Sequence, residues 1–209
     1  MDPRQSQSCT AFAGTTRIAS GAPADVAAGC KAFADSDDER AVLVFDDVTA
    51  QPVEFDLRGS LDDVLRRLSD ERSSTPSEAP GDDPAPTDRA AGRPRLGVVG
   101  REVTLLPRHW EWLNAQPGSA SVTLRKLVDQ ARRANASADR VRRAQEAAFR
   151  FMSAIAGNER GFEEASRALF AGDRDRFAEQ TASWPCDVMD FARALAEDAF
   201  AKDETSIRS

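Results

Sequence analysis

Apolar residues in the first part of the chain recur with the spacing of short strands. Apolar runs at residues 9–13 and 17–20 flank a turn that contains Gly14, and this pattern predicts a β-hairpin. The run RAVLVF at residues 40–45 predicts a third strand, because β-branched and aromatic residues favour extended backbone. Apolar and polar residues then alternate over residues 52–57, which predicts a fourth strand with one buried face.

Two helical patterns alternate with these strands. The first begins at Pro23, whose fixed backbone angle suits an opening helical turn, and the second follows Ser60. The order β-β-α-β-β-α predicts a small α+β domain over residues 1–68, with helices on one face of a mainly antiparallel sheet. The apolar stripes of the two helices are Val26, Cys30 and Phe33, and Leu61, Val64, Leu65 and Leu68.

A polar segment follows at residues 69–92. It is rich in Ser, Pro, Asp and Ala and contains no large apolar side chain, so it cannot bury enough surface to offset the entropy of ordering. We expect a flexible, disordered acidic linker over these residues, with a domain boundary inside it.

The next segment, residues 93–135, predicts a strand followed by two helices. Residues 101–106 are mostly apolar or β-branched and stop at Pro107, which suits the end of a strand, or of a hairpin over residues 96–106. The helix that starts there is expected to bury Trp110. A second helix follows a Pro-Gly pair, and its apolar stripe consists of Thr123, Leu124, Leu127, Val128 and Ala131.

Two motifs in this segment carry a family resemblance. Leu106-Pro107 ends the strand, and Gly118-Ser119-Ala120-Ser121 opens the second helix, which resembles the ribbon-helix-helix family of DNA-binding proteins. The resemblance implies that two chains pair their strands over residues 101–106 and that the paired ribbon enters the major groove. Val103 and Leu105 then lie in the dimer interface, where they replace the usual polar base readers, so contacts to phosphate are expected instead.

Residues 136–203 predict a helical region. Apolar residues recur there at helical spacing in four stretches, and Gly157, Gly172 and Pro185 separate them. The whole chain is therefore expected to be α+β, with a small N-terminal ββαββα domain, a flexible acidic linker, and a C-terminal strand or hairpin followed by a helical domain.

Charge is distributed unevenly along the chain. The net charge is −7, yet residues 93–143 hold eleven Lys/Arg and four Asp/Glu. A basic module in an acidic protein either binds a polyanion such as DNA or docks on acidic protein surfaces. The residues expected to contact phosphates are Arg101, Arg125, Lys126, Arg132 and Arg133.

Further motifs are spread over the whole chain. They include Thr10-Ala11-Phe12-Ala13-Gly14, Val44-Phe45-Asp46-Asp47, Asp56-Leu57-Arg58-Gly59, Leu105-Leu106-Pro107-Arg108-His109-Trp110, Phe149-Arg150-Phe151-Met152 and Ala168-Leu169-Phe170-Ala171-Gly172-Asp173-Arg174. With these motifs the chain resembles a bacterial family of uncharacterised proteins, the domain-of-unknown-function family 2239. That resemblance implies no established activity.

The sequence holds few residues for catalysis or metal binding. It contains a single histidine, His109, no tyrosine and no Gly-rich phosphate loop, so we expect no catalytic residue, metal, cofactor or enzymatic activity. The three cysteines form no Cys-x-x-Cys pair and are expected to be free thiols. Because no apolar run reaches membrane-spanning length and the N-terminus lacks an apolar signal core, we expect a cytoplasmic protein without a membrane partner.

Three functions compete on this basis. The leading hypothesis is a DNA-associated regulatory protein that dimerises through residues 101–106. The alternative is a protein–protein interaction module without nucleic-acid binding, anchored by Trp112, because Trp110 and Trp112 cannot share one helical face. The third is an enzyme of unknown class that uses His109 as a general base.

Overall fold

The computed structural model describes residues 8–73 and 102–201. The chain divides into two compact units. The first, which we call the core unit, is formed by Met1–Thr75 and Asn135–Ser209, so it combines both ends of the sequence. The second, which we call the arm, is formed by Pro76–Ala134 and is described over residues 102–134.

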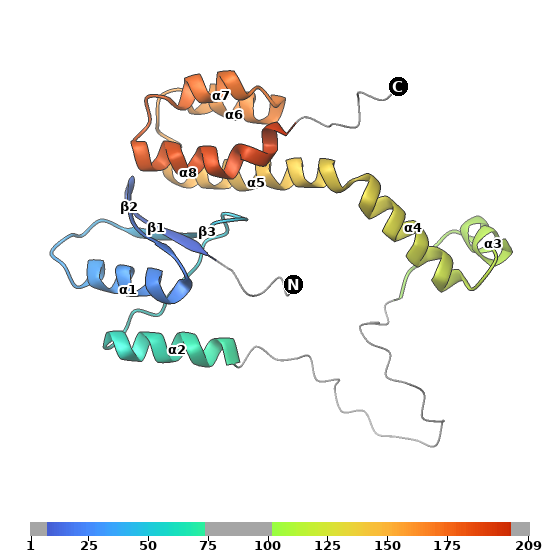
Figure 1. Cartoon of the computed structure of the whole chain (residues 1–209), viewed down its shortest axis with the longest axis horizontal. Coiled ribbons are helices and arrows are strands. Elements are labelled where there is room, and N and C mark those ends of the chain that lie inside the picture. The colour runs from blue at the N-terminus through green and yellow to red at the C-terminus, as the bar shows by residue number, and fades with distance from the viewer. Residues whose placement is uncertain (1–7, 74–101, 202–209) are drawn as a thin grey trace, which may run out of the picture. The chain divides into compact units, whose positions relative to one another are not determined.

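A three-stranded antiparallel sheet lies inside the core unit. Its strands are β1 (Cys9–Ala13), β2 (Thr16–Gly21) and β3 (Val42–Asp46), in the order β2-β1-β3. β1 and β2 form the expected hairpin, and its turn contains Gly14 with a positive φ of 59°. All residues of the central strand β1 are buried, because helices cover both faces of the sheet (Figure 1).

The prediction of a fourth strand over residues 52–57 is wrong. Pro52 forms an isolated bridge to Phe45, and the residues after it are irregular. Proline has no N–H to donate to a ladder, and Asp56 is held in place by an ion pair with Arg67 at 3.4 Å. The alternation of side chains nevertheless survives, since three residues of this segment pack against the buried cluster around β1: Val53, Phe55 and Leu57.

The first helical layer consists of α1 (Pro23–Ala34), which packs on β1 and β2. Pro23 opens the helix, as predicted, and Val26 and Cys30 are buried against the sheet. Their partners on the sheet come from the central strand β1 and the edge strand β3: Cys9, Ala11 and Val44. Burial raises the pKa of the Cys30 thiol, so this side chain is held as a neutral apolar residue.

The helix α2 (Leu61–Ser73) packs against α1 (Figure 1). Ser60 and Asp63 close its first turn, because the Ser60 hydroxyl donates to the Asp63 carboxylate at 2.7 Å and so lowers the pKa of that carboxyl. The helix includes residues 69–73, which we expected in the linker. They contain no helix breaker, and the first proline after α2 is Pro76. The remainder of the expected linker, residues 74–92, lies outside the described residues.

Helices follow in the C-terminal part of the core unit, as predicted for residues 136–203. The break between the second and third is made by Gly172, whose φ of 69° suits a helix end, and by Asp173, whose carboxylate accepts a hydrogen bond from the Arg176 amide at 3.0 Å. The elements are α5 (Ala136–Ile155), α6 (Phe162–Ala171), α7 (Arg174–Thr181), α8 (Cys186–Ala196) and the short 3-10 helix η1 (Glu197–Phe200).

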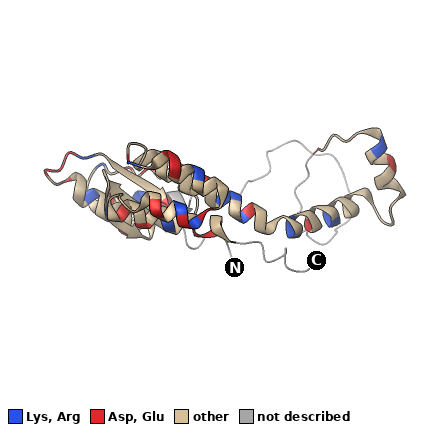
Figure 2. Ribbon diagram, turned by 90° about the horizontal axis from the view of Figure 1, so that it is seen from above, with Lys and Arg blue, Asp and Glu red and all other residues tan. Residues whose placement is uncertain are grey.

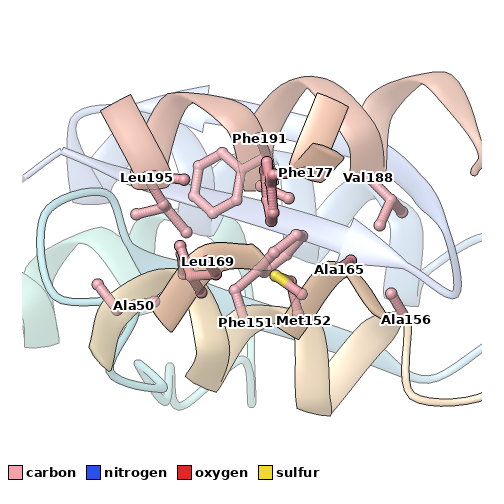
Figure 3. Packing of buried hydrophobic residues seen from close by; sticks show 14 of the residues in the cluster. Ala50, Phe151, Met152, Ala156, Ala165, Leu169, Phe177, Val188, Phe191 and Leu195 are labelled. Atoms are coloured by element: carbon pink, nitrogen blue, oxygen red, sulfur yellow. The ribbon is translucent and has the colours of Figure 1, made fainter. Parts of the chain in front are cut away.

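An aromatic cluster joins the sheet to these helices. The ring of Phe12 on β1 lies 5.2 Å from the ring of Phe151 on α5 and 5.4 Å from that of Phe191 on α8. Phe45 on β3 lies 5.3 Å from Phe151 in an edge-to-face arrangement. Phe151 and Phe191 meet 4.7 Å apart, and both point into the buried space between α5 and α8 (Figure 3).

One hydrophobic core is therefore built from both ends of the sequence. We expected residues 1–68 and 136–203 to form separate regions, whereas Phe12, Phe45 and Ala50 belong to the same buried cluster as the C-terminal helices. The physical reason is that β1 carries apolar or small residues on both faces. α1 covers one face, so the other needs a second apolar layer, and α5 and α8 supply it.

The arm contains a helical hairpin in its described part. Its helices, α3 (Pro107–Ala115) and α4 (Ala120–Ala134), pack against each other and are joined by a turn with Gly118 at a φ of 105°. Both helices were predicted. The strand expected before them is absent over residues 102–106, where no described segment offers a ladder partner, and residues 96–101 of the expected hairpin lie outside the described ranges.

We expect the aromatic cluster to be the strongest determinant of stability in the core unit. Replacing Phe12 or Phe151, both fully buried, by Ala should lower the free energy of unfolding by about 3–5 kcal/mol, because each change leaves a cavity. Phe170→Ala is the matched control; that side chain is 52% exposed and should cost about 1 kcal/mol. Urea unfolding followed by circular dichroism measures these differences, and equal losses for all three variants would contradict the assignment.

Candidate functional site

The arm carries most of the residues that the sequence marked for function. Among its described residues, Leu113 alone is buried, with an exposed fraction of 3%. Large apolar side chains remain exposed on both helices and on the segment before them. They are Val103, Leu106, Trp110, Trp112, Val122, Leu127 and Val128.

The two tryptophans of α3 are both exposed. We expected Trp110 to be a core residue, and this is wrong, since 38% of it is accessible. Leu113, one turn further along α3, is the residue that packs against α4 instead. Among the described elements, α3 packs closely against α4 alone, so this nine-residue helix buries a side chain on only one side. Trp112, the predicted interface anchor, is 51% exposed.

The segment before α3 holds the other two residues assigned to an interface. Val103 is 55% exposed and Leu105 is half-buried. The backbone of residues 102–106 is not part of any described sheet. The Leu106 carbonyl accepts hydrogen bonds from the His109 and Trp110 amides of α3, whereas residues 102–105 form no ladder with a described segment. Pairing across a dimer, which the ribbon-helix-helix resemblance implies, stays a prediction.

Four of the five residues predicted to contact phosphate lie on α4. Arg125, Lys126, Arg132 and Arg133 are all exposed, whereas Arg101 lies outside the described ranges. Figure 2 shows Lys and Arg positions, in blue, recurring along this helix. Within the part of the chain that the structure describes, none of the four forms an ion pair; the Arg125 side chain donates to the Ser121 carbonyl at 3.1 Å.

The apolar and basic residues of α4 occupy different sides of the helix. A helix advances about 100° per residue, which places Leu124, Leu127 and Val128 on one side. Lys126 and Arg133 then fall on the opposite side. One helix can therefore bind an apolar partner and still present cations to solvent.

The residues considered for catalysis form no constellation. His109 is exposed in the first turn of α3, and its imidazole makes no hydrogen bond with a described residue. In the described ranges no group of three or more His, Cys, Asp or Glu side chains is placed to hold a metal ion. Likewise, no described helix has the length and apolar character needed to cross a membrane.

A second candidate site, a groove on the core unit, was not predicted from the sequence. The groove has a volume of about 830 Å³ and lies between α5, the end of α8 with η1, and the loop after β3. Its charged lining residues are Arg140, Arg143, Glu146 and Arg150 of α5, Asp47 of the loop, and Glu197 and Asp198 of η1. The sequence contains the pair Asp46-Asp47 and several arginines in residues 140–150, but no local pattern places them together.

Comparison with known proteins identifies a family. A family model described as "Uncharacterized protein conserved in bacteria (DUF2239)" matches residues 8–196, so the chain belongs to this family. No curated protein and no solved structure gives a significant match. The comparisons do not show the ribbon-helix-helix resemblance.

Proposed function

We propose that this member of the DUF2239 family acts by binding rather than catalysis, and that its arm joins two copies of the chain through α3 and α4. The observation that carries the proposal is the set of exposed apolar side chains on the arm, with Leu113 as the one buried residue among those described there. An exposed apolar surface of this kind is typical of a protein-interaction site.

The helices of the arm are too short to be stable without a packing partner. Isolated helices shorter than about 12–15 residues are marginal in water, and α3 has nine residues and α4 fifteen. Two helices that bury one side chain between them gain little from tertiary packing. A second hairpin laid on the stripe of Leu124, Leu127 and Val128 completes a four-helix arrangement in which both stripes become buried.

A second copy fits this surface better than an unrelated partner does. In a two-fold dimer the same patch meets itself, so it must carry both complementary charges and shared apolar residues. The described arm carries five Lys/Arg and three Asp/Glu, which include Arg125 and Arg132 beside the stripe and Glu111 on α3. Residues 102–105, which pair with no described strand, can also pair with the same segment of a second chain.

We therefore expect the wild-type chain to sediment as a dimer and the double variant Leu127→Ser, Val128→Ser to sediment as a monomer. Burial of each side chain contributes about 1.5–3 kcal/mol, so the dimer dissociation constant should rise at least about tenfold. Analytical ultracentrifugation over a concentration series measures this change.

Val122→Ser provides the control for this experiment. Val122 is 37% exposed, similar to Leu127 at 41%, but it lies on the opposite side of α4. It should leave the dimer intact. A wild-type chain that stays monomeric at all concentrations, or a Val122→Ser variant that dissociates as readily as the double variant, would refute association through this stripe.

DNA binding is the second candidate, favoured by the exposed cations of α4. Arg125, Lys126, Arg132 and Arg133 have no acidic partner among the described residues, and Lys126 and Arg133 stay on the outer side when the apolar stripe is covered. Such cations supply affinity for phosphates without reading bases, so binding should be steep in salt and poorly selective.

Replacing Arg125 and Lys126 by Ala tests this candidate. Each lost phosphate contact lowers the log-log salt slope by about 0.9, so the double variant should lose about two units and weaken for all duplexes alike. Fluorescence anisotropy with several unrelated duplexes measures both effects. Arg142→Ala is the control, because Arg142 is paired with Asp139 at 2.8 Å. A loss confined to one sequence, or no loss at all, would contradict the assignment of phosphate contacts.

A further inference from the structure

We propose that the groove on the core unit binds a peptide segment in which an acidic residue lies next to apolar ones, with Arg143 as the partner of the carboxylate. The groove belongs wholly to the core unit and shares no residue with the arm. The inference is therefore independent of self-association and of DNA binding.

One wall of the groove is a loop that side-chain hydrogen bonds hold in place. The Asp46 carboxylate accepts hydrogen bonds from the Val48 amide at 3.1 Å and from the Thr49 amide and hydroxyl at 2.7 Å each. The side chain of Arg150 donates to the Thr49 carbonyl. Since these bonds hold the loop in one shape, a ligand meets a surface that needs no ordering on binding.

Two further observations show that the surrounding structure fixes the shape of this loop. Asp47 accepts a hydrogen bond from the buried Thr10 hydroxyl at 2.7 Å, which ties the loop to β1. Ala50, fully buried, has a positive φ of 49°, a backbone region that costs an alanine about 1–2 kcal/mol. Backbone strain of this kind persists where the surrounding structure imposes it, and it clusters at binding sites.

The opposite wall supplies an available cation. Arg140 pairs with Asp198 at 3.8 Å, and both side chains are more than half exposed, so this pair is weak. Arg143 is exposed and forms no ion pair or hydrogen bond with a described residue. Its guanidinium presents the planar fork that suits a carboxylate.

Apolar groups lie beside this cation. Ala144, Ala194 and Leu195 contribute to the groove between α5 and α8, and Val48 projects from the loop with 75% of its surface exposed. A large apolar side chain so exposed at the edge of a groove gains by contact with an apolar ligand. A ligand that fits both features combines one negative charge with apolar neighbours.

The acidic lining residues argue against a polyanion. Asp47, Glu146, Glu197 and Asp198 share the groove with the arginines, so nucleic acid or polyphosphate would meet several carboxylates there. The groove opens to solvent, and its volume of about 830 Å³ suits several residues of extended chain. A peptide with a single acidic side chain needs only Arg143, the lining arginine without a described partner, and it matches the size of the groove.

The test uses the full chain and two blocked peptides, acetyl-Ala-Leu-Glu-Leu-Ala-amide and its Glu→Gln counterpart. Titration followed by amide resonances should show the Glu peptide shifting Val48, Thr49 and Ala144, which line or adjoin the groove. The Gln peptide should bind about tenfold more weakly, since it loses a charge-assisted hydrogen bond of about 1.5 kcal/mol.

Two variants decide whether Arg143 is responsible. Arg143→Ala should abolish the preference for Glu over Gln, whereas Arg142→Ala, which removes a neighbouring arginine that does not line the groove, should retain it. Four results would overturn the proposal. They are no binding by the Glu peptide, equal binding of both peptides, a preference for Glu that survives Arg143→Ala, and the same resonance shifts produced by acetate alone.

Discussion

The contact of Phe12 with Phe151 and Phe191 is the interaction on which the rest of the core unit depends. It joins a strand at the start of the chain to two helices near its end, with ring distances of 5.2 Å and 5.4 Å. The sheet has three short strands, and such a sheet gains independent stability only when its apolar faces are covered. α1 covers one face, and the second is covered only if the C-terminal helices return to it. Both candidate sites follow from the return of the C-terminal helices to the sheet. The groove lies between the loop after β3 and α5 with η1. The arm is, in sequence, an insertion between the two halves of one core.

Because the arm is an insertion, the residues that it uses for binding contribute little to the stability of the core unit. The arm adds one buried residue in its described part, Leu113, while the core unit holds a large buried cluster of its own. Sequence changes on the exposed sides of α3 and α4 thus cost the core unit little. The proposed self-association involves exposed residues of α4. The proposed peptide groove instead depends on the loop between Asp46 and Ala50, whose shape is fixed by hydrogen bonds. Two binding surfaces on separate units can act without competing for the same residues.

Local signals in the sequence predicted the elements well, and tertiary signals were lacking. The hairpin around Gly14 and the helices opened by Pro23 and Pro107 were found because turn and helix-start residues act over a few positions. The shared core was missed because periodicity shows which residues lie on one face but not which distant element covers it. The same limit explains Trp110, which shares a helical pattern with Leu113 yet is exposed. The groove was beyond sequence reasoning, since its lining residues meet only when β3, α5 and α8 are assembled.

Residues 1–75 and 135–209 lie in one compact unit, and the shared aromatic cluster implies that they unfold together. The most direct measurement is to prepare these two fragments separately, to mix them, and to follow urea unfolding by circular dichroism and sedimentation. Each fragment alone should lack a cooperative transition, because it exposes its half of the aromatic cluster. The mixture should form a 1:1 complex with a single transition. A cooperative transition of fragment 1–75 alone, unchanged when fragment 135–209 is added, would show that the two segments fold independently.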